Sequence, residues 1–177
     1  FFRPSQRWRV YRHGGSLDQQ LARLAGQEID GLWVHPLRES DMSRILKLSL
    51  PTVCTSSQID PARHDLPGIG FAQIDEYAVG KMAAEHLLNK GISRLWSFQM
   101  AWLRRHRLQQ AGFRDAAIQA GAEYRGFWSD RSNPLDLDSE PVDVVREEQI
   151  IQWLDGLEFP CGLFFSDLGY ADNCSDL

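Results

Sequence analysis

Apolar and polar residues along this chain alternate between two periods, one typical of buried strands and one typical of helices. Short runs rich in β-branched and aromatic residues are followed by segments in which apolar residues recur every three or four positions. The runs that predict strands are residues 8–11, 31–35, 52–55, 69–74, 95–98, 123–128 and 162–165. The segments that predict helices are residues 16–25, 40–50, 75–90, 103–120 and 142–157. Strands that alternate with helices in this order predict βαβ units and parallel sheets.

The segment from Ile74 to Gly91 carries the most complete helix signal in the chain. Asp75 is the predicted N-cap, because its carboxylate accepts backbone N–H groups at the positive end of a helix, and Gly91 is the predicted left-handed cap at the other end. Gly80 lies inside the helix at a cost of about 1 kcal/mol relative to alanine, so we expect close packing there. The apolar face is predicted at Val79, Met82, Ala83, His86 and Leu87. A histidine on such a face is more often packed in a core than a ligand, and we interpret His86 in this way.

Short-range signals mark other helix ends and two loops. Ser16 and Gln19 form a predicted capping box. Ser40 is predicted to cap a short helix that Pro51 terminates, and Gly121 to end the helix over residues 103–120. Residues 58–70, which contain two prolines and two glycines, predict a loop, and polar residues 129–141 predict another.

This order of elements predicts an α/β fold with two doubly wound lobes, each built on a parallel sheet. We place the passage between the lobes at residues 90–94, so that the N-terminal lobe spans residues 1–92 and the C-terminal lobe spans residues 93–177. In open α/β sheets, ligands bind beyond the carboxyl ends of the strands. The positions there are His35, Asp75, residues 99–102, Trp128 and residues 166–167.

The composition is that of a soluble acidic protein. The net charge of −5 disfavours nucleic-acid binding by this segment. The three cysteines, Cys54, Cys161 and Cys174, include no Cys-x-x-Cys pair, so neither a zinc site nor a disulfide framework is predicted. We interpret Cys54 and Cys161 as buried thiols in a reducing cytoplasm. No apolar run approaches the roughly 20 residues that cross a bilayer, and no signal peptide is visible, so we expect no membrane association.

The sequence lacks the motifs of enzyme chemistry. No Gly-x-Gly-x-x-Gly follows a strand, and there is no Walker loop, no Gly-x-Ser-x-Gly elbow and no His-Glu-x-x-His. Pairs of acidic residues fall in a predicted loop and on a solvated helix face, where nothing supplies the apolar pocket that a general acid needs. We therefore expect no enzyme activity, no catalytic residue, no metal site and no cofactor.

Two sets of side chains near strand ends are binding candidates. Residues 104–107 read Arg-Arg-His-Arg at the start of a predicted helix, where cations oppose the helix dipole. They form either a solvated turn paired with nearby carboxylates or a group that directs a guanidinium into a ligand cleft. Trp102 and Trp128 are either packed in the protein or offer a flat apolar face to a sugar ring.

Short motifs along the chain form a set that is typical of one protein family. In chain order they are Asp30-Gly31, Leu50-Pro51-Thr52-Val53, Ile74-Asp75 with Gly80, Ala84, His86-Leu87-Leu88 and Gly91, Ala111-Gly112-Phe113 with Ala116 and Gly121, and Ser166-Asp167 with Ala171. This set resembles the effector-binding core of the lactose-repressor family, whose fold is shared with periplasmic sugar-binding proteins. Residues 148–167 resemble a narrower branch, the xylose-operon regulators, in which such a core precedes an AraC-type helix-turn-helix domain.

The resemblance implies a type I periplasmic-binding-protein-like fold that is incomplete at its C-terminal side, because the closing strands of both lobes are missing. It implies a sugar effector, a pentose such as xylose, bound between the lobes, a DNA-binding domain outside this chain, and a homodimer. Carried over by position, Asp75 matches a cleft-lining aspartate and Asp167 an acidic ligand contact. Gln109 stands where family members commonly have an arginine, and Arg107 is a nearby substitute.

Three other interpretations remain open at this point. The chain is alternatively a periplasmic or surface sugar-binding receptor of a transport system with the same fold and no DNA partner. A sugar- or nucleotide-handling α/β enzyme would need a phosphate loop or a nucleophile–base pair, and the sequence shows neither. A degenerate family member that keeps the fold only for oligomerisation is compatible with the glutamine at position 109.

Overall fold

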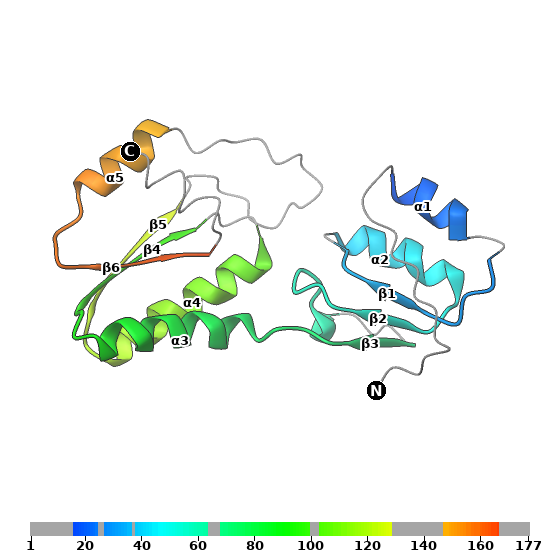
Figure 1. The fold of residues 1–177 in the computed structure, drawn as a ribbon, viewed down its shortest axis with the longest axis horizontal. Helices are drawn as coiled ribbons and strands as arrows, with labels where there is room; N and C mark the ends of the chain where they lie inside the picture. Colours follow the sequence, from blue (N-terminus) through cyan, green and yellow to red (C-terminus); the bar gives the residue numbers. More distant parts are fainter. Residues whose placement is uncertain are drawn as a thin grey trace, which may run out of the picture.

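The structure is a computed structural model that describes residues 16–24, 27–36, 38–63, 68–99, 103–128 and 147–166. Its elements form two groups that lie side by side along the longest axis of the molecule (Figure 1). The first unit comprises α1 (Leu17–Leu24), β1 (Leu32–Val34), α2 (Glu39–Ile45), the 3-10 helix η1 (Leu46–Leu48), β2 (Thr52–Cys54), the 3-10 helix η2 (Pro61–Arg63) and β3 (Ile69–Phe71). The second unit comprises α3 (Glu76–Asn89), β4 (Arg94–Gln99), α4 (Arg104–Gln119), β5 (Glu123–Trp128), α5 (Glu147–Asp155) and β6 (Gly162–Phe165).

Each unit is built on a three-stranded parallel sheet. In the first sheet the order is β1-β2-β3, and Trp33, Val53 and Gly70 lie at the same level. In the second sheet the order is β5-β4-β6, with Ser97 of the central strand opposite Gly126 and Phe164. These parallel sheets with their helices confirm the predicted α/β architecture.

Helices α1 and α2 of the first unit pack on one face of its sheet. The buried core there is formed by Met42 and Ile45 of α2 with Cys54 and Ile59. Cys54 is buried, as predicted, and burial raises the pKa of its thiol, whereas Cys161 is only partly buried, so the prediction holds for Cys54 and not for Cys161. An ion pair between Arg44 and Asp18 joins α2 to α1.

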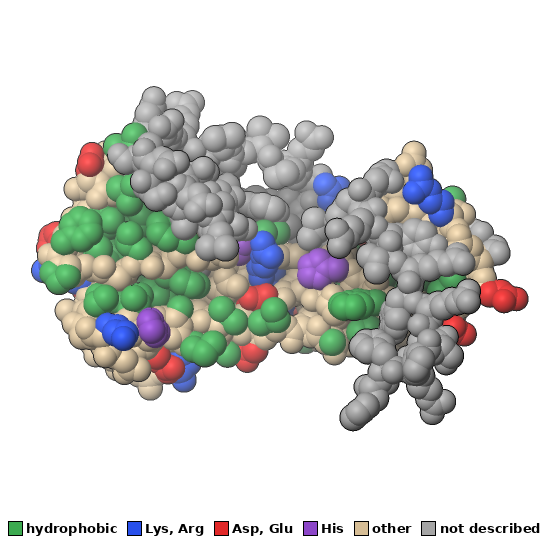
Figure 2. Space-filling view, in the orientation of Figure 1, with side chains coloured by type: hydrophobic (Ala, Val, Ile, Leu, Met, Phe, Trp, Pro, Cys, Tyr) green, Lys and Arg blue, Asp and Glu red, His purple; other side chains and the backbone are tan. Residues whose placement is uncertain are grey.

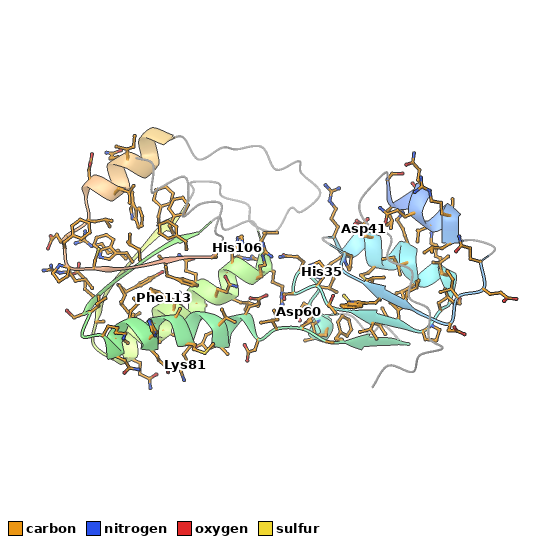
Figure 3. All side chains as sticks on the ribbon, in the orientation of Figure 1. His35, Asp41, Asp60, Lys81, His106 and Phe113 are labelled. Atoms are coloured by element: carbon orange, nitrogen blue, oxygen red, sulfur yellow. The ribbon has the colours of Figure 1, made fainter. Side chains whose placement is uncertain are left out.

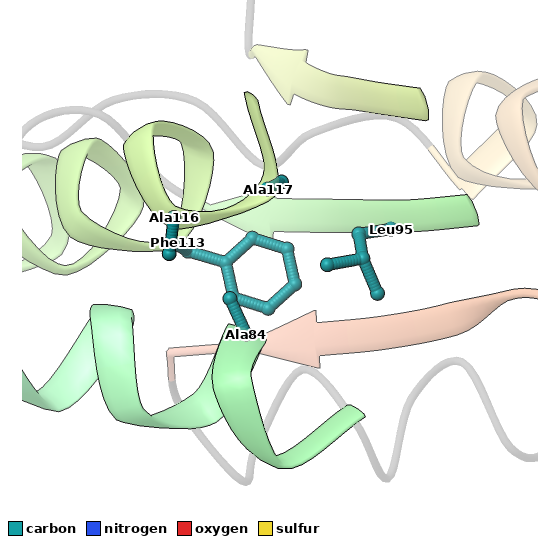
Figure 4. Close-up of a cluster of buried hydrophobic side chains, with 5 residues drawn as sticks. All are labelled: Ala84, Leu95, Phe113, Ala116 and Ala117. Carbon is teal, nitrogen blue, oxygen red and sulfur yellow. The ribbon is translucent and has the colours of Figure 1, made fainter. Parts of the chain in front are cut away.

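The second unit is covered on both faces of its sheet. Helices α3 and α4 cover one face, where Phe113 is fully buried against Ala84, Leu95 and Ala117 (Figure 4). Side chains alternate across a strand. Trp96 and Phe98, one and three residues after Leu95 in β4, therefore face the opposite side of the sheet from Leu95 and pack against Trp153 of α5. The ring centroid of Trp153 lies 6.2 Å from that of Trp96 and 5.7 Å from that of Phe98.

Helices α3 and α4 approach each other at two glycines. A Cβ atom at Gly80 would lie 1.7 Å from the carbonyl oxygen of Gln109, and a Cβ atom at Gly112 would lie 2.0 Å from that of Tyr77. The two backbones are therefore in direct contact, which confirms the close packing predicted at Gly80. Two helix backbones can pack this closely only where no side chain stands between them, which is why both contact positions are glycines.

Several predicted helix ends are confirmed by their hydrogen bonds. The backbone N–H of Ser16 donates to Gln19 Oε1 at 3.3 Å and that of Gln19 donates to Ser16 Oγ at 3.4 Å, as a capping box requires. Asp75 Oδ1 accepts from the backbone N–H of Ala78 at 3.0 Å. Gly91 and Gly121 have φ values of +80° and +71°, so both are left-handed caps.

One predicted N-cap is wrong. Arg38, with extended backbone angles and no side-chain capping bond, is the N-cap of α2, and Ser40 lies inside the first turn. The first turn of α2 contains Glu39 and Asp41, whose carboxylates favour the positive helix end without a capping hydroxyl.

The buried face of α3 also differs from the prediction. Glu76, Gly80 and Ala84 are its buried residues, whereas Met82 is 62% exposed and His86 is exposed. Small residues at 80 and 84 let α4 approach on that side, and this contact decides which way the helix faces. Met82 and His86 line an open apolar groove beside β6 instead, so His86 is not a core histidine.

Helix α3 belongs to the second unit by its contacts. Ala84 shares the core of Leu95 and Phe113 with the second sheet, whereas our sequence-based boundary assigned residues 1–92 to one lobe. The chain leaves the first sheet after β3 and enters the second unit at α3, so residues 72–75 connect the units.

Some predicted segments cannot be compared with the structure. The strand over residues 8–11, the loop over residues 129–141 and the first turn of the helix over residues 142–157 lie outside the described residues. Among the helices that are described, none has the length and apolar character that a transmembrane span needs.

Candidate functional site

The two units contact each other where the loop after β2 meets the first turns of α3 and α4. We call this region the junction and define it by His35 after β1, residues 55–60 after β2, residues 72–76 after β3 and residues 104–110 of α4, which follow β4. His35 and Asp60 lie on the side of the first unit that faces α4, and His106 lies near the start of α4 (Figure 3). Histidine, basic and acidic side chains gather on the surface between the two halves (Figure 2).

The side of the junction that belongs to the first sheet is organised by the hydroxyl group of Thr55. This hydroxyl donates to the carbonyl oxygen of Val34 at 3.3 Å and accepts from Trp33 Nε1 at 3.1 Å. His35 Nδ1 lies 3.2 Å from the same oxygen. Because the single proton of the hydroxyl is donated to Val34 in this arrangement, His35 Nδ1 is the donor, and His35 Nε2 is left for a further partner.

The loop that follows β2 is buried although it has no regular structure. Ser56 and Ile59 are 0% exposed, so their backbone groups need partners within the protein. Gln73, in the connection between the units, donates its side-chain N–H groups to the carbonyl oxygens of Ser56 at 2.5 Å and of Ile59 at 2.8 Å. The loop is thereby fixed against the connection between β3 and α3.

Glu76, the first residue of α3, places a buried carboxylate at the centre of the junction. It is 6% exposed, and a buried charge is stable only when hydrogen bonds satisfy it. Its Oε1 accepts from Ser57 Oγ at 2.7 Å and its Oε2 accepts from Gln109 Nε2 at 2.6 Å. The positive end of α3 adds to this stabilisation. Gly80, one turn later on the same face, lets α4 come close enough for Gln109 to reach the carboxylate.

Arg104 binds the same loop from the start of α4. Its backbone N–H donates to Gln58 Oε1 at 2.8 Å, and its Nη1 donates to the carbonyl oxygen of Ser57 at 2.9 Å. Its Nη2 lies 3.5 Å from Asp60 Oδ1. A cation at the first turn of a helix is unfavourable by itself, and here the Asp60 carboxylate and a backbone carbonyl offset that cost.

The structure places four of the seven predicted site residues with their side chains. Asp75 is the exposed N-cap of α3, beside Glu76. Gln109 bonds Glu76, His35 contacts Thr55, and Arg107 lies on α4 two residues before Gln109. The Glu76 carboxylate thus joins Gln109 to the start of α3, next to Asp75, and His35 lies after β1 beside Thr55.

The other three predicted site residues cannot be placed in this way. Asp167 and Trp102 lie outside the described residues. Trp128 is the last residue of β5, and its side chain is also outside the description.

Glu76 and Arg104, which organise the junction, were not predicted as site residues. Glu76 could have been found from Gly80, because residues four apart share a helix face and a glycine there indicates that another backbone is near. Arg104 was part of the basic cluster, but nothing local connects it to Ser57, which is distant in the sequence. Within the described part of the chain, no group of three or more His, Cys, Asp or Glu side chains is arranged to hold a metal ion.

No protein-family model matches the sequence, and no curated protein sequence matches it. Solved structures do match the fold. A probable maltose operon transcriptional repressor from Staphylococcus aureus matches with a TM-score of 0.63 and 12% identity, over 90% of this chain and 54% of its own. A periplasmic binding protein/LacI transcriptional regulator from Alkaliphilus metalliredigens, in complex with D-xylulofuranose, matches with a TM-score of 0.58 and 18% identity, over 89% and 53%.

The Cra transcriptional dual regulator from Pseudomonas putida, in complex with fructose 1-phosphate, also matches, with a TM-score of 0.58 and 18% identity, over 90% of this chain and 56% of its own. The chain thus spans about half the length of the solved structures it matches. These similarities concern the fold, since the identities are low. The chain has the type I periplasmic-binding-protein-like fold of LacI-type regulators.

Proposed function

We propose that this chain is the sugar-sensing part of a transcription regulator, and that a sugar bound at the junction favours one arrangement of the two units. The observation that carries the proposal is the polar junction at which the loop after β2 meets α3 and α4, because open α/β folds bind ligands beyond the carboxyl ends of their strands. Matched structures with this fold are regulators, and two of them hold a sugar or sugar phosphate.

The proposed sugar contacts are side chains that offer both donors and acceptors to hydroxyl groups. Asp75 and His35 are exposed at the junction. Gln109 Oε1 is a buried acceptor with no hydrogen-bond partner among the described residues, and a buried acceptor of this kind is stabilised when a ligand hydroxyl donates to it. Arg107, Asp167, Trp102 and Trp128 complete the proposed set.

The chemistry of position 109 favours a neutral sugar over a phosphorylated one. An arginine would offer a charged planar fork that binds phosphate, whereas Gln109 carries no charge and its Nε2 already donates to Glu76. We propose a pentose such as xylose, on the resemblance of residues 148–167 to xylose-operon regulators. We further propose DNA binding through an AraC-type domain outside this chain, a homodimer, and a cytoplasmic location.

Isothermal titration of the purified protein against a sugar panel tests the proposal. The panel contains D-xylose, L-arabinose, D-ribose, D-xylulose, D-glucose, maltose and fructose 1-phosphate. We expect heat of binding with at least one pentose and none with fructose 1-phosphate. No heat with any sugar would exclude the sensing role, and binding of fructose 1-phosphate alone would exclude the neutral-pentose proposal.

Matched variants on α4 test the place of binding. Gln109→Ala removes the proposed contact, whereas Gln119→Ala removes an exposed glutamine at the other end of the same helix. We expect the first change to weaken sugar binding about tenfold or more, as for a buried hydrogen bond, and the second to leave it unchanged. A mobility-shift assay of the full-length protein with operator DNA, with and without the sugar, distinguishes a regulator from a transport receptor. A transport receptor would not bind the DNA.

A further inference from the structure

Residues 56–60 belong to the first unit in the chain but are bonded to the second unit. Ser57, Gln58 and Asp60 each contact Arg104 of α4, and Ser57 also donates to the buried Glu76. Four of the loop residues are less than a tenth exposed, with Ser56 and Ile59 at 0%, Gln58 at 4% and Ser57 at 7%. This segment is therefore part of the contact between the units.

The loop lies beside the connection that joins the two units. Gln73, which holds the carbonyl oxygens of Ser56 and Ile59, is a residue of that connection. Any rotation of one unit against the other requires changes of backbone angles within residues 72–75, since hinges are a few residues between packed elements. The hydrogen bonds of Gln73 and Arg104 to the loop beside this connection restrict that rotation.

The contacts of Arg104 are directional as well as charged. Its guanidinium meets a carbonyl oxygen with Nη1 and a carboxylate with Nη2, while its backbone N–H meets an amide oxygen. The planar guanidinium can reach two partners at once only in a narrow range of orientations. A change in the angle between the units would break these contacts. It would also break the hydrogen bond from Ser57 to the Glu76 carboxylate.

We propose that Arg104 and residues 56–60 form a brace between the units, which holds the angle seen in this structure and limits the population of other angles. Arg104 is a positioning residue in this role, since it holds a loop rather than a ligand. The brace needs no sugar. Its effect on sugar affinity rests on the proposed function, because a ligand that binds one arrangement is bound more weakly when that arrangement is less populated.

The distance between spin labels on the two units tests the brace directly. Lys47 in η1 and Gln119 at the end of α4 are exposed, and Lys47→Cys with Gln119→Cys gives one label on each unit. Cys161→Ser and Cys174→Ser remove the other cysteines that react, since Cys54 is fully buried. Pulsed dipolar spectroscopy then records the distribution of distances without sugar.

We expect Arg104→Ala to shift and broaden this distribution. Arg114→Ala, on the same helix, is the matched control, because Arg114 contacts Asp115 beside it, and its distribution should equal that of the parent. Arg104→Lys keeps the charge without the fork and should give an intermediate result. Asp60→Asn, which removes only the ionic partner, should cause a smaller shift and serves if Arg104→Ala does not fold.

The same variants separate failure of the brace from failure of the proposed function. We expect Arg104→Ala to change the apparent Kd of the bound pentose about tenfold or more, in parallel with the change in distance. Folded Arg104→Ala and Asp60→Asn proteins that both keep the parent distribution would refute the brace, even if sugar binds. A changed distribution in a protein that binds no sugar would support the brace and reject the sensing role.

Discussion

The two units bury their parallel sheets to different extents. In the second unit, α3 and α4 cover one face and α5 covers the other, so that Trp96 and Phe98 are 2% and 1% exposed. In the first unit, among the residues that the structure describes, helices cover one face only. Trp33 on the other face is 70% exposed and Val53 is 43% exposed. The second unit is thus closed by its own helices.

This difference indicates which unit supports the other. The first unit has a smaller core, and its buried loop 56–60 depends on Arg104 and Glu76 of the second unit. The second unit contributes two long helices in backbone contact, which form a rigid support. We infer that a substitution that destabilises the second unit also destabilises the first, whereas one that destabilises the first unit leaves the second stable. The following substitutions test this asymmetry.

The largest expected effect is that of Phe113→Ala. Phe113 is fully buried between α3, α4 and the second sheet, so its truncation should cost about 3–5 kcal/mol of unfolding free energy. Met42→Ala in the first core should cost about 2 kcal/mol or more. Hydrogen exchange followed by mass spectrometry should show faster exchange in both units for Phe113→Ala and only in the first unit, residues 16–71, for Met42→Ala. Equal spread of exchange from both sites would contradict the asymmetry.

A glycine in each unit provides a second contrast. Gly80→Ala places a methyl group against the backbone of α4, and forcing the helices apart should cost about 1–3 kcal/mol. Gly70→Ala in β3 is the control, because its Cβ atom would have Val53 Cγ2 as nearest neighbour at an ordinary 3.7 Å. Urea unfolding of the two variants should show a loss for the first and little change for the second. A comparable loss at Gly70 would mean that the first sheet is as tightly packed as the helix pair.

Substitutions of Asp75 distinguish its role as the N-cap of α3 from a role in ligand binding. Asp75→Ala removes the N-cap of α3 and should cost about 1 kcal/mol, whereas Asp75→Asn keeps a good cap and loses the charge. Urea midpoints should therefore fall for alanine and stay for asparagine. Titration with the bound pentose should weaken for both variants if the carboxylate contacts the sugar. Full binding by the asparagine variant would limit Asp75 to its role as a cap.

The smallest expected effect is that of the bond between Tyr77 Oη and Asp115 Oδ2, which joins α3 to α4 at 3.2 Å. The hydrogen bond to Asp115 raises the pKa of Tyr77, and the hydrogen bond from Arg114 lowers the pKa of Asp115. The contribution of Tyr77 is present below its unfolded pKa and is lost as pH rises through the raised value. That of Asp115 is present above its unfolded pKa and is lost as pH falls through the lowered value.

Melting temperatures of the parent and of Tyr77→Phe should therefore differ slightly near neutral pH. The difference should vanish in strong acid and in strong alkali, where one partner of the bond is protonated or the other is ionised. A constant difference across the whole range would show that the hydroxyl acts through packing rather than through this bond.

The elements that the sequence predicts best are those with signals at both ends. The helix from Asp75 to Gly91 begins and ends as its cap residues indicate, and β5 and β6 have their predicted bounds. The predicted buried face of α3 is wrong because hydropathy ranks Met82 above Gly80. Contact between helix backbones selects the small residue instead.

The candidate site was predictable only in part, for a related reason. Strand ends pointed to His35 and Asp75, because their place follows from the order of elements. The partners of Glu76 and Arg104 lie in a loop of the other unit, and no period or spacing along the chain links positions so far apart. Such pairs become visible only when the two sheets are placed together.

Three of the contacts that hold the loop 56–60 are made to its main-chain oxygens. Gln73 and Arg104 bind the carbonyl groups of Ser56, Ser57 and Ile59, which every amino acid possesses. These three contacts depend on Gln73 and Arg104 rather than on the identity of the loop residues. Exchange of the loop side chains would therefore keep these main-chain anchors while removing the contacts that Ser57, Gln58 and Asp60 make with the second unit.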